Sequence, residues 1–66
     1  MRVRVNRRWL QLFDGATVRN AVLRYYAVRR WDVSTVDDAV VRDAYGHETD
    51  LDAPLTDGQQ ISVEKD

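Results

Sequence analysis

The sequence predicts a single small α+β domain, in which a mixed sheet of four to five strands packs on one helix. Three observations support this fold class. Segments of alternating polarity lie near both ends of the chain, apolar residues at helical spacing lie between them, and Asp-Gly turns separate these segments. The chain has 66 residues, so we expect one domain spanning residues 1–66 with a small core.

The first two strands are predicted at the N-terminus. Residues 1–5 read MRVRV, the alternation expected of a strand with one buried and one exposed face. Residues 9–13 resume this alternation, with Leu10 and Leu12 on one side and Trp9 on the other. Because the connection between the two runs is short, they are expected to form an antiparallel hairpin.

One amphipathic helix is predicted next. Asp14-Gly15 marks a turn, and Thr17 is placed to act as the helix N-cap. The predicted buried stripe consists of Val18, Ala21, Val22, Tyr25 and Val28. Arg29 and Arg30 suit the C-terminal end of the helix dipole. Three apolar side chains beside the stripe either widen the core contact or form an exposed contact site: Leu23, Tyr26 and Trp31.

The second half of the chain is predicted to add two strands. Residues 34–37 read as a polar connection, and residues 38–43 contain a short β-branched run that predicts a third strand. A bend is expected at residues 45–47. Pro54 lacks an amide hydrogen, so a central strand is not expected around it. The alternating residues 60–64 predict the last strand.

Charge is distributed unevenly along the chain, although its formal net charge is only −1. Residues 1–33 carry a net +6, whereas residues 34–66 carry −7. The two halves either neutralise each other across strand pairs, at under about 1 kcal/mol for each exposed pair, or form a two-poled surface that orients a partner. Net neutrality argues against general nucleic-acid binding, which needs an excess of basic charge.

Composition excludes several kinds of site. The chain has no cysteine and one histidine, His47, so disulfides, thiolate metal sites and histidine-rich clusters are excluded. The glycines are isolated, so no phosphate-binding loop is expected. We therefore predict no metal and no cofactor. No apolar run approaches the roughly 20 residues of a membrane span, and no signal peptide is recognisable, so we expect a cytoplasmic protein.

An acid/base unit at His47 is the one catalytic arrangement to weigh. Asp43, Glu48 and Asp50 lie close to this imidazole in the sequence. Turn chemistry explains aspartates around Gly46 more simply, and no serine or cysteine stands nearby as a nucleophile. We therefore predict that the isolated chain is not an enzyme.

The outward face of the sheet is the candidate binding site. If the apolar residues of the hairpin point at the helix, five other side chains share the opposite face: Arg2, Arg4, Trp9, Val40 and Arg42. An aromatic residue among arginines is typical of protein-interface centres. The alternatives are an ordinary solvated face, on which Trp9 makes cation–π contact with arginine, and a stacking site for single-stranded nucleic acid. We predict a protein partner.

Three segments carry a family resemblance: Met1-Arg-Val-Arg-Val-Asn6, Phe13-Asp-Gly-Ala-Thr-Val18 and Ala53-Pro-Leu-Thr-Asp-Gly-Gln-Gln-Ile-Ser-Val63. With these segments the chain resembles the sulfur-carrier proteins of thiamine and molybdopterin biosynthesis, the ThiS and MoaD group, over nearly its whole length. TGS domains and other ubiquitin-like modules share part of the pattern. The resemblance implies a ubiquitin-like β-grasp fold. It also implies a flexible Gly-Gly tail, whose terminal carboxylate an activating enzyme adenylates before its conversion to a thiocarboxylate.

The tail that this chemistry needs has no counterpart in the sequence. No glycine follows Gly58, and the chain ends with Val63-Glu-Lys-Asp66. The carrier residues therefore have no positions here onto which they can be transferred. We expect a ubiquitin-like interaction module, or a small accessory subunit that binds a larger enzyme subunit. The alternative is a sulfur carrier or another tail-activated modifier, seen without its tail, whose partner would be an activating enzyme.

Overall fold

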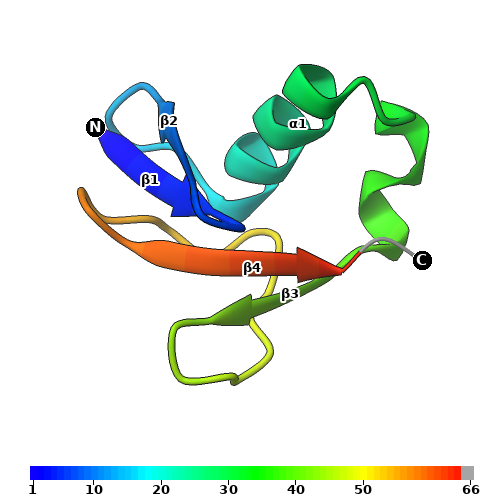
Figure 1. Cartoon of the computed structure of the whole chain (residues 1–66). Coiled ribbons are helices and arrows are strands. Elements are labelled where there is room, and N and C mark those ends of the chain that lie inside the picture. Colours follow the sequence, from blue (N-terminus) through cyan, green and yellow to red (C-terminus); the bar gives the residue numbers. More distant parts are fainter. Residues whose placement is uncertain (65–66) are drawn as a thin grey trace.

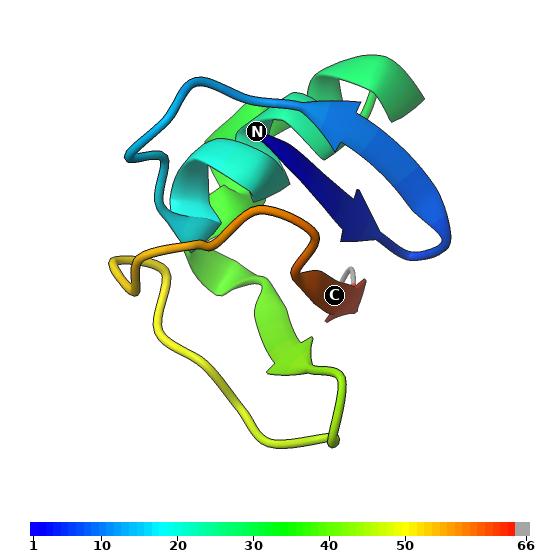
Figure 2. The same ribbon diagram turned by 90° about the vertical axis from the view of Figure 1, so that its left-hand side faces the viewer.

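The computed structural model describes residues 1–64, which form a four-stranded mixed sheet with one α-helix on one of its faces (Figures 1 and 2). The predicted fold class, a small α+β domain, is confirmed at this level. None of the helices in residues 1–64 combines the length and the apolar character needed to cross a membrane. The elements are β1 (Arg2–Val5), β2 (Arg8–Gln11), α1 (Val18–Arg29), η1 (Val33–Asp38), β3 (Val40–Asp43) and β4 (Gln60–Glu64).

The strands lie in the order β2-β1-β4-β3. The predicted antiparallel hairpin of β1 and β2 is confirmed, and β3 pairs antiparallel with β4. In the centre, β1 pairs in parallel with β4, so the first and last strands of the chain lie side by side (Figure 1). A parallel pair needs a long crossover connection, which here contains β2, α1, η1 and β3.

The two residues between β1 and β2 both adopt positive φ, 47° at Asn6 and 70° at Arg7. Two-residue hairpin loops favour this conformation because its twist matches that of the strands. The side chain of Asn6 also reaches across to β4. Its Nδ2 donates to the Val63 carbonyl at 3.0 Å, and its Oδ1 accepts from the Val63 amide at 3.0 Å. Asn6 therefore connects the hairpin turn to the last strand through its side chain.

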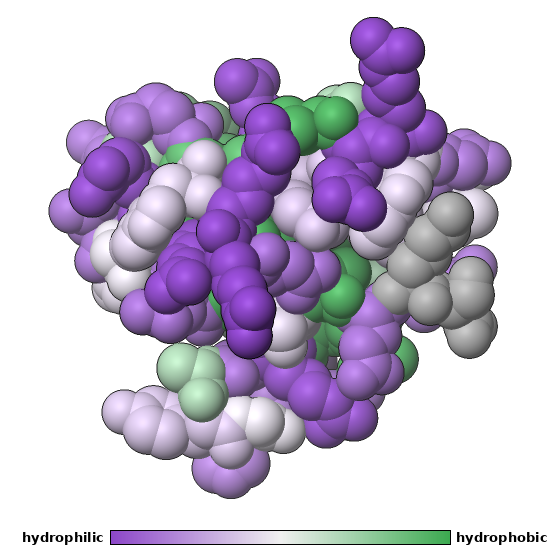
Figure 3. Space-filling view, viewed as in Figure 1, coloured by the Kyte–Doolittle hydropathy of each residue, from purple (hydrophilic) through white to green (hydrophobic). Residues whose placement is uncertain are grey.

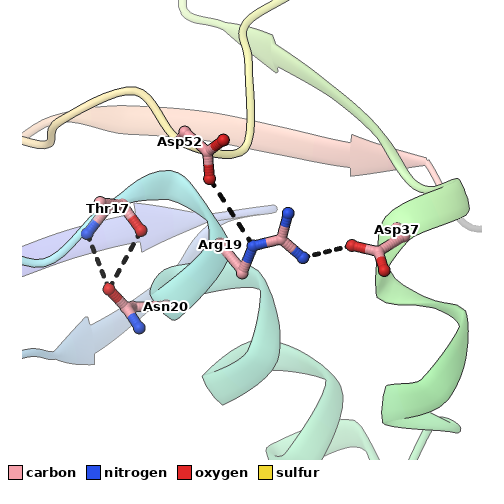
Figure 4. Close-up of polar contacts among 5 residues, drawn as sticks. All are labelled: Thr17, Arg19, Asn20, Asp37 and Asp52. Carbon is pink, nitrogen blue, oxygen red and sulfur yellow. Dashed lines mark hydrogen bonds and ion pairs between the residues drawn. The ribbon is translucent and has the colours of Figure 1, made fainter.

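Helix α1 begins at the predicted N-cap, Thr17. Asn20 Oδ1 accepts from the Thr17 amide at 2.9 Å and from its hydroxyl at 3.1 Å (Figure 4). The first amides of the helix are satisfied by a remote loop, because Val18 N–H donates to the Ala53 carbonyl and Arg19 N–H to the Leu51 carbonyl, at 2.9 and 2.7 Å. Residues 51–53 are thus held against the start of the helix.

The predicted helix stripe is correct for four of its five members, which are buried: Val18, Ala21, Val22 and Tyr25. Val28 was assigned wrongly, since 36% of it is exposed. Tyr26 is buried in its place. Both Tyr25 and Tyr26 pack edge-on against Trp31, with ring centroids 5.5 and 5.2 Å apart. These aromatic contacts beyond the helix end show that the residues beside the stripe widen the core.

Residues 33–38 form η1, where the sequence predicted only a polar connection. Asp32 caps this short helix, as its Oδ1 accepts from the Ser34 amide at 3.0 Å. Val36 turns inward and is 3% exposed. The buried core comprises Val3, Val5, Leu10, Leu12, Ala16, Val18, Ala21, Val22, Tyr25, Tyr26, Val36, Val41, Leu55, Ile61 and Val63.

Candidate functional site

The five predicted contact residues lie on one face of the sheet. We call the face turned away from α1 the outer face. In each strand the neighbours of these residues are buried on the helix side, for example Val3 and Val5 in β1 and Leu10 in β2. Because side chains alternate along a strand, the outer face carries Arg2, Arg4, Trp9, Gln11, Val40, Arg42, Gln60, Ser62 and Glu64.

The first group of predicted residues lies on the hairpin. Arg4 is directly opposite Trp9 in the antiparallel register. The guanidinium carbon of Arg2 lies 5.0 Å from the centroid of the Trp9 ring, a cation–π contact. Trp9 remains 44% exposed. The ring is thus held in place by arginine and still presents surface to solvent.

The second group lies across β4. Arg42 is opposite Ser62, and Val40 is opposite Glu64. The charge of Arg42 is partly neutralised, because its Nε lies 4.0 Å from Glu64 Oε1 and its Nη1 donates to the Gly46 carbonyl at 3.2 Å. The structure therefore places Arg42 and Val40 on the same face as Trp9, with β4 between them and the hairpin arginines.

A shallow hollow of about 440 Å³ borders the first group at Arg4. Arg4 and Arg7 lie on its hairpin side and Asp43 on its β3 side, while Gln60 and Ser62 come from β4 between them. The sequence analysis did not assign Arg7, Gln60 or Ser62 to the site. The alternation of β4 could have identified the last two, but the position of Arg7 depends on the turn.

The hairpin carries four arginines: Arg2, Arg4, Arg7 and Arg8. Within residues 1–64, no ion pair involves Arg2, Arg4, Arg7 or Arg8. Among the described residues, no ion pair joins the hairpin strands to β3 or β4, as neutralisation across strand pairs would require. One carboxylate from the second half of the chain does approach the hairpin, because Asp57 Oδ1 accepts from the Arg2 amide at 2.7 Å.

Both ion pairs that join the two halves of the described chain use Arg19 in α1. Arg19 bonds to Asp37 of η1, and its Nε lies 3.8 Å from Asp52 (Figure 4). The hydrogen bond to Asp37 raises the pKa of Arg19, and so does the charge of that carboxylate. These contacts hold η1 and the loop that contains Asp52 against α1, away from the outer face.

His47 and its neighbouring acids have the geometry of a turn. Asp43 Oδ1 accepts from the amides of Tyr45 and His47 at 2.9 and 3.0 Å. These bonds, chiefly that from the His47 backbone, lower the pKa of Asp43. The imidazole Nδ1 is 4.0 Å from Asp43 Oδ2, and its side chain is exposed. The turn accounts for these contacts, while the absence of enzymatic activity stays a prediction.

The remaining surface offers few alternatives. In the part of the chain that the structure describes, no group of three or more acidic or histidine side chains could hold a metal ion. The side shown in Figure 3 is covered mainly by hydrophilic residues, with apolar ones in small separate areas. Outside the outer face, the large exposed apolar residues include Phe13, Val33 and Tyr45. Trp9 differs from these residues in its cation–π contact with Arg2.

Comparisons of the chain with family models, curated proteins and solved structures found no match. The resemblance to the ThiS and MoaD group therefore stays a prediction. Of the residues compared with the carrier tail, Val63 and Glu64 belong to β4. Lys65 and Asp66 lie outside the residues that the structure describes.

Proposed function

We propose that this chain is a ubiquitin-like β-grasp protein that works as a non-catalytic interaction module, or as a small accessory subunit of a larger enzyme assembly. The mixed sheet with a central parallel pair and a helix on one face is compatible with that fold. The docking surface in this proposal is the outer face of the sheet. The partner presents an acidic protein surface to it.

The observation that carries the proposal is the half-exposed Trp9 among arginines that make no ion pair within residues 1–64. Interface centres are enriched in tryptophan and arginine, and a few such residues supply most of the binding free energy. Arg2 orients the ring from one side. Arg4 is paired with Trp9 in the register and also borders the hollow. A carboxylate of the partner can enter the hollow while an apolar group covers the indole.

The conformation of Arg7 supports the same surface. A non-glycine residue in the left-handed region costs about 1 kcal/mol, and glycine is the favoured residue at this hairpin position. Arg7 nevertheless occupies it, with φ 70°, and borders the hollow. Backbone strain of this kind gathers at functional sites. An arginine kept at a strained position adds positive charge where an acidic partner would dock.

The test is affinity purification of the chain, expressed in its native source, with quantitative mass spectrometry of what co-purifies. The variant W9A/R4A removes the centre of the proposed surface. The matched control, V33A/R29A, removes an exposed apolar residue and an exposed arginine that lie away from the sheet. We expect the control to retain a stoichiometric partner and W9A/R4A to weaken its binding roughly tenfold or more. Equal recovery with both variants would refute the outer-face proposal.

The sulfur-carrier alternative depends on residues beyond Glu64 and stays an untested prediction. The same purified material decides it through its intact mass. A chain that ends in Gly-Gly, or that shows a sulfur-for-oxygen mass shift, would favour the carrier. A mass ending at Asp66 with a stoichiometric partner would favour the interaction module.

A further inference from the structure

The outer edge of β2 has main-chain groups that point away from the sheet. Met1 and Leu12 exchange both of their hydrogen bonds, at 2.7 and 2.8 Å. Hydrogen-bonded and non-hydrogen-bonded pairs alternate along an antiparallel ladder. Arg2↔Gln11 and Arg4↔Trp9 are therefore non-hydrogen-bonded pairs. The amides and carbonyls of Trp9 and Gln11 consequently face outward, beyond the last strand of the sheet.

The opposite edge of the sheet is closed. On β3, the Asp43 amide donates to the His47 carbonyl at 2.8 Å, and the Val41 carbonyl accepts from the Thr49 amide at 2.9 Å. The loop after β3 thus covers the outward groups of that strand. Among residues 1–64, β2 is the edge strand that no other segment covers. An uncovered edge is a template for another strand.

A second hollow, of about 450 Å³, runs beside this free edge between β2 and α1. Leu12, Phe13 and Leu23 make it apolar, and Arg24 adds a positive charge at its rim. Phe13 is 63% exposed. A strand added to β2 would direct alternate side chains into this hollow and the others toward the outer face beside Trp9.

Charge selects the occupant of this edge. Arg8 is exposed on β2 itself, Arg2 and Arg4 lie on the neighbouring strand, and none of the three makes an ion pair within residues 1–64. A second copy of this chain paired at the same edge would bring like charges together, which destabilises strand pairs. An acidic strand would instead be attracted to the arginines.

We propose that the β2 edge binds an extended acidic segment of a partner protein as a fifth strand. Main-chain bonds to Trp9 and Gln11 supply its affinity. Alternate apolar side chains in the hollow between β2 and α1, with acidic side chains on the other face, supply its specificity. The inference rests on the proposed function only in taking the chain to be an interaction module, because it concerns the strand edge and not the outer face.

The test uses heteronuclear NMR and a synthetic peptide of about ten residues, a length suited to a strand. The peptide has blocked ends and alternates valine with aspartate. We expect saturable binding and slowed hydrogen exchange at the amides of Trp9 and Gln11. A peptide that alternates valine with lysine should bind at least roughly tenfold more weakly. A peptide of the same composition, with valine and aspartate in separate blocks, should also bind roughly tenfold more weakly.

Two further measurements test the strand geometry. The variant Q11P removes the outward-facing amide of residue 11 and leaves every hydrogen-bond donor between β1 and β2 in place. We therefore expect peptide binding to weaken about tenfold. Should Q11P fail to fold, the wild-type chain is titrated with peptides that are N-methylated at odd or at even positions. Only one of the two sets should abolish binding, because only alternate amides of an added strand face β2.

Three results would overturn the inference. The first is no saturable binding of the valine–aspartate peptide up to millimolar concentration. The second is binding that shifts Arg4 and Gln60 without protecting Trp9 and Gln11, which would leave the outer-face proposal standing alone. The third is concentration-dependent dimerisation that protects the same two amides without peptide, which would identify a second copy as the occupant.

Discussion

Asn6 is predicted to be the most important polar side chain for the stability of the sheet. It makes two hydrogen bonds to Val63 and adopts a φ of 47°. Replacing Asn6 with Ala removes both bonds, each with a net stability contribution of about 1 kcal/mol. It also places alanine in the left-handed region, which costs about 1 kcal/mol more. The expected loss is therefore about 3 kcal/mol.

A loss of this size is a large part of the total. A chain of 66 residues has a free energy of unfolding of about 5 kcal/mol by the usual per-residue range. The N6A variant should therefore retain about 2 kcal/mol, and its urea midpoint should fall to less than half of the wild-type value. Urea denaturation followed by far-ultraviolet circular dichroism measures this directly.

The matched variant N6G separates the two contributions. Glycine tolerates positive φ without the steric cost but cannot bond to Val63. We expect N6G to lose about 2 kcal/mol, less than N6A, because only the hydrogen bonds are removed. The reasoning would be refuted if N6A stayed within about 0.5 kcal/mol of the wild type, the range of an ordinary surface substitution. It would also be refuted if N6G were less stable than N6A.

Three further predictions concern other elements. R7G should raise the free energy of unfolding by about 1 kcal/mol, because it removes an L-residue from a φ of 70°; an equal or lower urea midpoint would contradict this. V36A should lower the free energy of unfolding by about 2 kcal/mol, because two buried methyl groups are lost and a cavity is left. An unchanged stability would instead indicate that residue 36 lies in an exposed polar connection. The backbone bonds that lower the pKa of Asp43 stabilise its ionised form, so this contribution is present above the ordinary aspartate pKa and is lost as the pH falls through the lower folded value. The free energy of unfolding, measured as the pH is lowered, should therefore fall less in D43N than in the wild type. Identical pH profiles for the two proteins would contradict the assignment.

Much of the fold was predictable because it depends on local patterns. Alternation of period two identified the hairpin and the last strand, and helical spacing identified α1 with Thr17 as its N-cap. The same alternation correctly grouped Trp9 with Arg2 and Arg4 on one face. Which side of a strand a residue occupies follows from its position alone, so the shared face of the predicted contact set needed no knowledge of the pairing.

Other features required contacts between distant segments. Val28 and Tyr26 both lie near the helix stripe, but the contact of Tyr26 with Trp31 decided which of the two is buried. Val36 looked like part of a polar connection because one apolar residue among polar neighbours has no periodicity. It is buried because η1 packs beside α1, where Arg19 bonds to Asp37.

The sequence by itself determined the four strands, the helix α1, the turns between them and five residues of the outer face. Only the tertiary structure decided that β1 lies in parallel beside β4, which puts Arg4 next to Gln60 and creates the hollow between the arginines and Asp43. It also decided that the edge of β3 is closed and that of β2 is free. The physical reason is range: strand faces and helix stripes arise from neighbouring residues, whereas strand pairing depends on the free energy of segments brought together from opposite ends of the chain.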